Sequence, residues 1–150
     1  MSHNILDTFK LFKAQPVKRP NTRPLFARAV PAGFPSPADD YIEKDLDLNE
    51  LVGSDNPAMF YFRVSGESMT GAGIFDGDIL SVDKSLEPRH KDIVVAVINS
   101  EITLKRLYKK DKVISLHPEN TDFSIIKITP EMEFVVWGVV TNVIRTLRTP

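Results

Sequence analysis

The chain has 150 residues, a length that suits one domain with a hydrophobic core, and its 42% hydrophobic and 26% charged residues are ordinary for a globular protein. It has no cysteine, which excludes disulfides, thiol nucleophiles and thiolate metal sites. No apolar run approaches the ~20 residues of a membrane helix, and the N-terminus lacks the order of a signal peptide. We therefore expect a cytoplasmic protein without membrane contact.

The formal net charge of −1 is unevenly distributed. Residues 1–32 carry six basic groups and one acid, a net charge of +5, whereas residues 33–150 carry 13 basic and 19 acidic groups, a net charge of −6. The basic segment is either a solvated tail or an element that docks electrostatically on its own body or on a partner.

The N-terminal part is predicted to be an extended arm. Apolar residues in 5–12 have partial helical spacing and predict one or two helical turns. Six of the eleven prolines then fall between Pro16 and Pro37. Because proline removes a backbone donor and restricts its neighbour, this stretch should be extended and poor in regular structure. An extended segment suits a protease cleft, although a plain linker has the same composition.

The rest of the chain is predicted to be mostly β. Residues 39–50 are acidic with interspersed apolar side chains and predict a short helix or turn packed on the body. Strand patterns follow at 60–64, 79–82, 93–98, 102–108, 113–116, 125–128 and 134–147. Short strands at close spacing without a long helix predict a curled, mostly antiparallel β domain with an extended N-terminal arm.

Two smaller features have structural interpretations. Asp76-Gly77-Asp78 predicts a tight turn rather than a metal site, because it lacks the ligand series of a calcium loop. Trp137 and its apolar neighbours are expected in the core or in a dimer interface. We expect neither a metal nor a cofactor.

The chemistry centres on a serine and a lysine. A serine hydroxyl needs a base within hydrogen-bond reach to act as a nucleophile. The three histidines, His3, His90 and His117, lie in the tail or in charged turns, which disfavours a serine–histidine–acid triad. Lys105 lies in a strand-like run, where it shares a face with Thr103 and Leu107 and where burial can lower its pKa to that of a base. The neighbouring Arg106 should point the other way.

The predicted nucleophile, Ser68, lies 37 residues before Lys105 in a turn of small residues. Gly66 allows the backbone to bend there, and the N–H groups of Ser68 and Glu67 are the expected donors to an oxyanion. Ala32-Gly33, 35 residues before Ser68, offers a bond between small residues. Together these residues predict a protein that cuts itself, with 1–32 as the removed arm and 33–150 as the peptidase domain.

The combination of motifs resembles the UmuD-type members (UmuD, MucA, RumA) of the LexA self-cleaving serine–lysine peptidase family. The similarity runs from about Pro24 to Leu147, and the stretches that carry it are Ala32-Gly33-Phe34-Pro35-Ser36-Pro37, Asp40-Tyr41, Asp47-Leu48-Asn49, Ser65-Gly66-Glu67-Ser68-Met69, Gly73-Ile74, Asp76-Gly77-Asp78, Lys105-Arg106-Leu107 and Gly138-Val139-Val140. In this resemblance Ser68 falls on the nucleophile, Lys105 on the general base and Ala32-Gly33 on the cleaved bond.

The resemblance implies a role in the SOS response to DNA damage. It implies a homodimer that removes its arm when stimulated by RecA filaments on single-stranded DNA. The trimmed dimer would then join a UmuC-like Y-family polymerase as the accessory subunit of error-prone translesion synthesis, the step of DNA repair that causes SOS mutagenesis.

Three departures qualify the resemblance. Only 32 residues precede Gly33, too few for the helix-turn-helix domain of LexA, so a repressor that binds a specific DNA sequence is disfavoured. Ala32 stands where UmuD has cysteine, as in LexA. The arm upstream of Pro24 is longer than expected for UmuD. Its residues 8–12 and 23–26 resemble segments that dock on the sliding clamp, but apolar residues that pack the arm on the body would have the same pattern.

Other functions remain open at the level of sequence. A dimeric module that regulates the polymerase without cutting itself would have the same fold. A general peptidase, such as a leader peptidase, would require a membrane anchor that we do not find. A repressor remnant is disfavoured further by the acidic body, which would repel phosphates.

Overall fold

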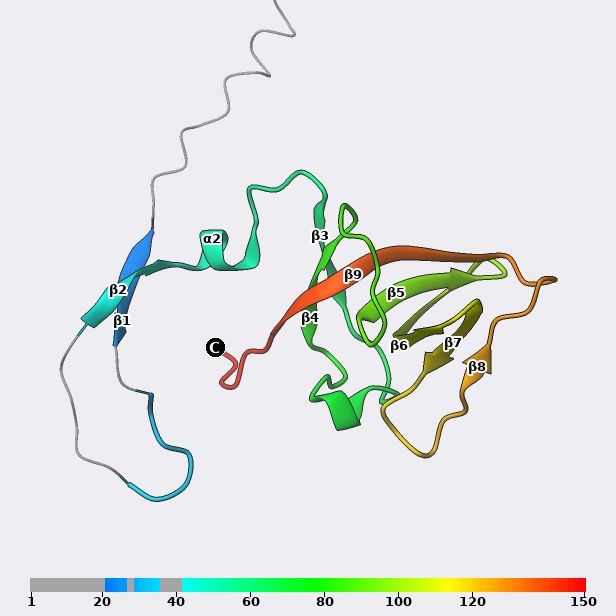
Figure 1. Ribbon diagram of the computed structural model, residues 1–150. Helices are drawn as coiled ribbons and strands as arrows, with labels where there is room; N and C mark the ends of the chain where they lie inside the picture. The colour runs from blue at the N-terminus through cyan, green and yellow to red at the C-terminus, as the bar shows by residue number, and fades with distance from the viewer. Residues whose placement is uncertain (1–20, 27–28, 36–41) are drawn as a thin grey trace, which may run out of the picture. The chain divides into compact units, whose positions relative to one another are not determined.

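The computed structural model describes residues 21–26, 29–35 and 42–150. The chain divides into two compact units, a smaller one that ends at Leu48 and a larger one from Asn49 to Pro150 (Figure 1). The helical turns predicted in 5–12 lie outside the described residues. No helix in the described part of the chain is long and apolar enough to cross a membrane.

The smaller unit contains a two-stranded antiparallel sheet of β1 (Thr22–Phe26) and β2 (Ile42–Asp47). Residues 22–26 are extended, as predicted, but the prediction that this stretch is poor in regular structure is wrong here, because these residues form a paired strand. The prediction of a short helix or turn at 39–50 is wrong for 42–47, because helix α2 (Leu48–Val52) begins only after β2. Acidic residues are uncommon in strands, so the alternation of side chains along β2 did not indicate a strand from the sequence. The pairing with β1 stabilises this segment as a strand.

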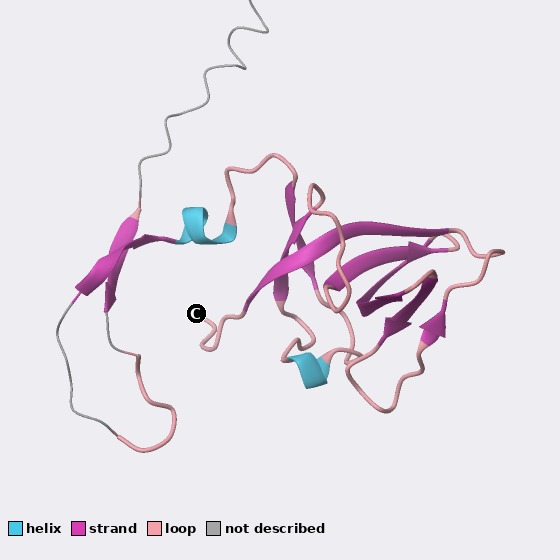
Figure 2. Ribbon diagram, viewed as in Figure 1, coloured by secondary structure: helices cyan, strands magenta, loops and turns pink. Residues whose placement is uncertain are grey.

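The larger unit contains one seven-stranded antiparallel sheet with the order β3-β4-β9-β5-β6-β7-β8. Its strands are β3 (Met59–Arg63), β4 (Ile79–Asp83), β5 (Ile93–Ile98), β6 (Glu101–Lys110), β7 (Val113–His117), β8 (Ile126–Lys127) and β9 (Phe134–Ile144). Figure 2 shows strands throughout this unit, and the short helix between β3 and β4 is the 3₁₀ helix Thr70–Ala72. The predicted fold class, mostly β and antiparallel, is confirmed.

Strand β9 joins the two halves of the sheet. It pairs with β4 along one edge and with β5 along the other, and the register shifts between Ser81 and Val82 and between Val95 and Ala96. Irregularities of this kind bend a strand and increase the local twist, which accounts for the curl of the sheet. Gly138 lies at a close crossing, where a Cβ atom would be 2.6 Å from Val82 Cγ1.

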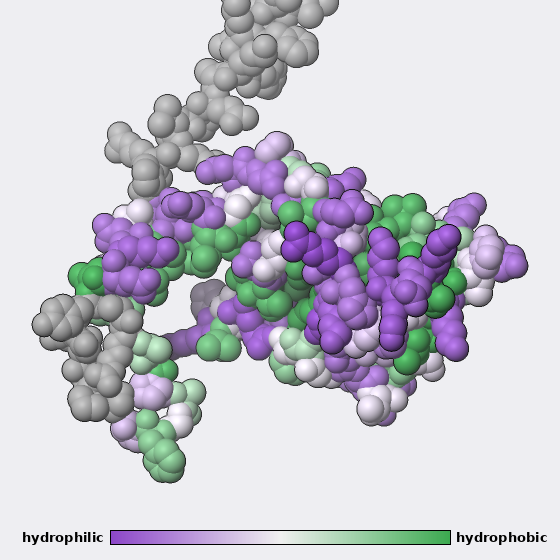
Figure 3. Space-filling model, viewed as in Figure 1, coloured by the Kyte–Doolittle hydropathy of each residue, from purple (hydrophilic) through white to green (hydrophobic). Residues whose placement is uncertain are grey.

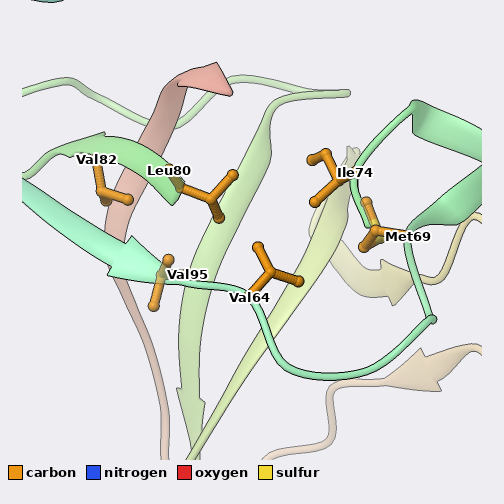
Figure 4. Close-up of a cluster of buried hydrophobic side chains, with 6 residues drawn as sticks. All are labelled: Val64, Met69, Ile74, Leu80, Val82 and Val95. Carbon is orange, nitrogen blue, oxygen red and sulfur yellow. The ribbon is translucent and has the colours of Figure 1, made fainter. Parts of the chain in front are cut away.

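Two hydrophobic clusters form the core of the larger unit. The first contains Val64, Met69, Ile74, Leu80, Val82 and Val95 (Figure 4), and the second contains Val94, Ala96, Leu107, Leu116 and Val139. Trp137 is half-buried and packs against the edge of the first cluster, with its ring edge-on to Phe60 and Phe62 at centroid distances of 5.1 and 4.9 Å. It thus contacts the core, which is one of the two places expected for it.

The predicted turn at Asp76-Gly77-Asp78 is also confirmed. The N–H of Asp78 donates to the carbonyl of Phe75 at 3.1 Å, and Gly77 has a φ of 88°, which favours glycine. The Asp78 carboxylate is buried and accepts from Arg145 Nε at 2.7 Å, and this hydrogen bond holds the pKa of Asp78 below its ordinary value. Asp78 therefore tethers the segment after β9. No group of three or more possible metal ligands occurs among the residues that the structure describes.

Candidate active site

Ser68 and Lys105 lie within hydrogen-bond distance of each other. Ser68 is half-buried in the loop after β3, and Lys105 lies in the middle of β6 with only 8% of its surface exposed. The Nζ of Lys105 is 3.1 Å from the Oγ of Ser68. Two groups that are 37 residues apart in the sequence are thus adjacent in the fold, as the self-cleavage hypothesis requires.

The surroundings of Lys105 disfavour its charged form. Its Nζ donates to Thr103 Oγ1 at 2.9 Å and to the carbonyl of Leu104 at 3.0 Å, in addition to Ser68. All three acceptors are neutral, so no carboxylate compensates for the loss of hydration. Burial therefore lowers the pKa of Lys105 below its ordinary value of 10.5. At an alkaline pH below 10.5, a larger fraction of Lys105 than of an exposed lysine is therefore the neutral amine. The neutral amine is the form that can accept a proton.

The Ser68 loop is held from both ends by neighbouring segments. Two residues before Ser68, Gly66 has a φ of 95°, and its N–H donates to the Asp76 carboxylate at 2.8 Å. Behind Ser68, the side chain of Met69 is buried in the first cluster, and its carbonyl accepts from the N–H groups of Ala72 and Ile74. The apolar anchor at Met69 fixes the position of the serine that precedes it.

A second contact braces the loop from the side of β7. The N–H of Glu119 donates to the Ser68 carbonyl at 2.8 Å, and the N–H of Gly71 donates to the Glu119 carbonyl at 2.7 Å. Asn120 Nδ2 donates to the carbonyl of Glu67 at 2.9 Å. The Glu119 carboxylate pairs with Arg106, the neighbour of Lys105, so the brace connects the serine loop to the strand of the lysine. The Arg106 guanidinium also donates to the carbonyl of Lys91 at 2.7 Å.

The expected oxyanion donors have no acceptor in the described structure. No described residue accepts a hydrogen bond from the N–H of Glu67 or Ser68, although the carbonyls of both residues are used by the Glu119–Asn120 brace. These two N–H groups are therefore available to an external acceptor.

A cavity of about 370 Å³ opens beside the pair. Its wall includes Val64, Ser68, Met69, Leu80, Lys105 and Phe123. Apolar side chains predominate, and the hydroxyl and the amine lie together in the wall. Such a site can hold a small apolar side chain of an extended peptide while presenting the peptide bond to Ser68.

The predicted scissile bond is accessible. Ala32 and Gly33 are exposed and lie in a bend, and no atom lies within 4 Å of the position that a Cβ at Gly33 would take. They belong to the smaller unit.

The histidines are engaged away from Ser68. His90 Nδ1 accepts from the N–H of Lys109 at 3.0 Å, whereas His117 stacks on Tyr108 and hydrogen-bonds Ser115. His3 lies outside the described residues. Neither described histidine forms a hydrogen bond with the Ser68 hydroxyl, whose partner among the described residues is Lys105.

Residues 24–141 match the family described as Peptidase S24-like. The chain belongs to this family. It is 46% identical to the protein ImpA of Salmonella typhimurium over 126 residues, which cover 84% of this chain and 86% of ImpA. It is 41% identical to the protein MucA of Escherichia coli over 133 residues, 88% of this chain and 90% of MucA.

A repressor also matches, but over part of its length. The LexA repressor of Bordetella avium is 40% identical over 123 residues, which cover 82% of this chain and 57% of the repressor. The similarity to ImpA, MucA and SamA identifies the chain as a UmuD-type member of the family. Its class is therefore that of the serine peptidases, within a family related to the SOS response.

Sequence reasoning missed three contributors to this site. Thr103 was placed on the face of Lys105 but not recognised as an acceptor for its Nζ. Glu119 and Asn120 gave no signal, because their contacts with the Ser68 loop are made mainly by backbone atoms and span about fifty residues.

Proposed function

We propose that this protein cleaves its own Ala32–Gly33 bond, with Ser68 as the nucleophile and Lys105 as the general base. The observation that supports this most directly is the 3.1 Å separation of Lys105 Nζ and Ser68 Oγ, with Lys105 only 8% exposed. A buried lysine without a carboxylate partner can be neutral where an exposed lysine would be charged. The Lys105 amine is thus close enough to the Ser68 hydroxyl to take its proton, and in its neutral form it can accept that proton, as activation of a serine requires.

The first half of the reaction forms an ester. Neutral Lys105 Nζ takes the proton of Ser68 Oγ as this oxygen attacks the carbonyl carbon of Ala32. The N–H groups of Glu67 and Ser68 stabilise the resulting oxyanion. The C–N bond to Gly33 then breaks, and the Lys105 ammonium returns its proton to the departing amine. Residues 1–32 remain attached to Ser68 through the ester.

The second half releases the arm. Lys105, neutral again, takes a proton from a water molecule that attacks the ester carbonyl. Breakage of the ester returns the proton to Ser68 Oγ and frees residues 1–32 as a carboxylate. The products are the fragments 1–32 and 33–150, and no cofactor takes part.

The relatives also support a proposal for the biological setting. We infer that the protein is a homodimer, that RecA filaments on single-stranded DNA stimulate its cleavage, and that the trimmed dimer is an accessory subunit of a UmuC-like, error-prone Y-family polymerase. The similarity to ImpA, MucA and SamA supports this inference. Of the two segments similar to clamp-docking peptides, 23–26 lies within β1 and 8–12 lies outside the described residues.

Intact mass spectrometry tests the proposal. The purified chain is incubated with and without an activated RecA filament, beside Ser68→Ala and Lys105→Ala. Ser124→Ala and Lys109→Ala serve as matched controls, because both residues are exposed and neither lines the cavity beside the pair. We expect fragments 1–32 and 33–150 from the parent and the controls, and none from the two test variants.

Two results would contradict the proposal. Cleavage of Ser68→Ala at the parent's rate would remove the serine from the mechanism. A parent that stays intact at alkaline pH and with the filament would favour the alternative, a dimeric module that regulates the polymerase without cutting itself.

A further inference from the structure

Asn120, in the connection between β7 and β8, holds the peptide group that carries one of the two expected oxyanion donors. Its Nδ2 donates to the carbonyl of Glu67 at 2.9 Å. This carbonyl and the N–H of Ser68 belong to the same peptide group, and the described peptide bonds are all trans. In a planar trans peptide the carbonyl and the N–H point in opposite directions, so a partner that fixes the carbonyl also fixes the N–H.

The two sides of this peptide group have different surroundings. Glu67 and Ser68 line the cavity beside Lys105, whereas Asn120 does not line it and instead lines a separate surface hollow among residues 117–125. Because the carbonyl of Glu67 points to Asn120, the N–H of Ser68 points to the other side, where the cavity lies. A substrate in the cavity would therefore meet the N–H and not Asn120.

Asn120 is itself held in one orientation. Its Oδ1 accepts from the N–H of Asp122 at 3.0 Å, while its Nδ2 donates to Glu67. A rotation of the amide by 180° would break both hydrogen bonds, so the two contacts together fix the side chain. Hydrophilic side chains predominate on the visible face of the larger unit (Figure 3), and a polar side chain at a surface can hydrogen-bond water alone. The half-buried Asn120 instead bonds backbone groups with both ends of its amide.

The hydrogen bond from Asn120 is the shorter of two that the carbonyl of Glu67 accepts. The other comes from the N–H of Thr70 at 3.4 Å, which is long for a bond of this kind. Asn120 thus supplies the stronger of the two. A hydrogen bond to a carbonyl polarises its peptide group, which makes the N–H of the same group a better donor.

We propose that Asn120 is a positioning residue for the reaction, because its hydrogen bond to the carbonyl of Glu67 aims the Ser68 N–H at the oxyanion and strengthens this N–H as a donor. The inference rests on the proposed self-cleavage. As the carbonyl oxygen of Ala32 gains negative charge, the N–H would stabilise it without having to reorient. Asn120 acts through this peptide group and not by contact with the reacting atoms.

Two variants of the full chain separate the donor of Asn120 from its acceptor. Asn120→Ala removes the donor to Glu67 together with the acceptor for the Asp122 N–H. Asn120→Asp keeps an acceptor for the Asp122 N–H and removes the donor alone. The two variants differ in charge and in the turn that they retain, so the missing donor is the change that they share.

Asn56→Ala is the matched control. Asn56 is also half-buried, its Oδ1 accepts from the N–H of Ala58 two residues on, and its Nδ2 donates to the Asp83 carboxylate. The control therefore loses the same two kinds of hydrogen bond at a place that does not line the cavity.

Self-cleavage is compared on the plateau of the pH–rate profile, where Lys105 is neutral in every variant. We expect both Asn120 variants to cleave about tenfold more slowly than the parent, a smaller loss than the ~10²–10³ that follows removal of a whole oxyanion donor. Asn56→Ala should keep the parent's rate. The midpoint of the profile should not move in Asn120→Ala, because Asn120 does not contribute to the hydrogen bonds of Lys105.

NMR measures the hydrogen bond itself. The spectra are recorded in a Lys105→Ala chain, which we expect to stay uncut, with and without the added substitutions. Loss of a hydrogen bond to a carbonyl lowers the ¹³C shift of that carbonyl and the ¹⁵N shift of the amide in the same peptide group. We expect both shifts, of the Glu67 carbonyl and the Ser68 amide, to fall in Asn120→Ala and to stay unchanged in Asn56→Ala.

Four results would overturn the proposal. Cleavage of Asn120→Ala at the parent's plateau rate would mean that the hydrogen bond does not serve the reaction. A parental rate in Asn120→Asp would assign the effect to the turn at Asp122. An equal loss of rate in Asn56→Ala would show general destabilisation, and unchanged NMR shifts in Asn120→Ala would show that the hydrogen bond is not made in solution. A parent that does not cleave itself would refute the proposed function as well, whereas a cleaving parent beside an equally fast Asn120→Ala would refute this inference alone.

Discussion

At the scale of single residues, the account depends on how Lys105 is held. Thr103 Oγ1 accepts a hydrogen bond from Nζ at 2.9 Å and therefore both orients the amine and stabilises its charged form. Thr103→Val keeps a β-branched side chain of similar shape and removes this acceptor. We expect the maximal cleavage rate to fall by about tenfold, less than the ~10²–10⁴ attributed to a general base, and the midpoint of the pH–rate profile to move down.

The Thr103→Val prediction separates two roles of the hydroxyl. A loss of rate without any change in the midpoint would mean that Thr103 only orients the amine. An unchanged rate and midpoint would show that Leu104 and Ser68 suffice to hold Lys105. The variant Thr121→Val, in an exposed loop position, provides a matched control.

The burial of Lys105 also has a cost in stability. Because its folded-state pKa lies below 10.5, the unfolded chain binds more protons between these two pKa values, so stability rises with pH across that interval. Lys105→Met removes the charge and keeps a long apolar side chain. At neutral pH we expect this variant to melt at a higher temperature than Ser68→Ala, which retains the lysine.

The difference in melting temperature should shrink as the pH rises through 10.5, because well above this value the lysine is neutral in both the folded and the unfolded state. Thermal denaturation of the two variants over this range checks the sign. A Lys105→Met variant that is less stable at neutral pH would mean that the hydrogen bonds of the ammonium outweigh its desolvation.

At the scale of elements, the brace between the serine loop and Glu119 requires glycine at position 71. A Cβ atom there would lie 2.5 Å from the Glu119 carbonyl oxygen, so Gly71→Ala must displace backbone on one side. We expect a loss of about 1–3 kcal/mol in the free energy of unfolding and slower cleavage, because the same contact positions Ser68. Denaturant titration and the cleavage assay measure the two effects.

A control for the Gly71→Ala prediction is Ala72→Gly, which adds no atoms to the same 3₁₀ helix. Full stability of Gly71→Ala would indicate that the Glu119 segment moves freely, and the brace would then have no part in positioning the serine.

The strands of the larger unit were predicted from local sequence patterns, whereas the order in which they pair in the sheet was not. Runs such as Ile93–Ile98 and Phe134–Val140 are β-branched and apolar, so their conformation is determined largely by adjacent residues. The pairing of β9 with both β4 and β5 depends on contacts across the whole chain. Strand β2 was missed because its carboxylates resemble a solvated loop, and only the pairing with β1 reveals it.

For the candidate site, the two reactive residues were predicted from the sequence, whereas the contacts that hold them in place were not. Ser68 and Lys105 could be chosen because few residue types activate a serine and because their motifs resemble a known family. The tether between Asp78 and Arg145 could not be foreseen, since a carboxylate in an Asp-Gly-Asp turn gives no sign of a partner 67 residues away. Contacts of this kind follow from topology rather than from local sequence.

At the scale of the whole molecule, the two units should differ in their dependence on the arm. Both hydrophobic clusters lie between Val64 and Val139 in the larger unit, and neither contains a residue of the first 48. We expect residues 33–150 to melt within about 2 °C of the uncut Ser68→Ala chain. A drop of ten degrees or so in a calorimetric scan would show that the arm supports the core.

The most direct test of the central claim is the rate of self-cleavage as a function of pH, from about pH 6 to about pH 11, followed by the mass of fragment 33–150. We predict a rate that rises with pH and levels off at a midpoint below 10.5, as the buried Lys105 loses its proton, with no cleavage in Lys105→Ala at any pH. A rate that does not change with pH, or a Lys105→Ala variant that cleaves with the parent's profile, would contradict the assignment of Lys105 as the base.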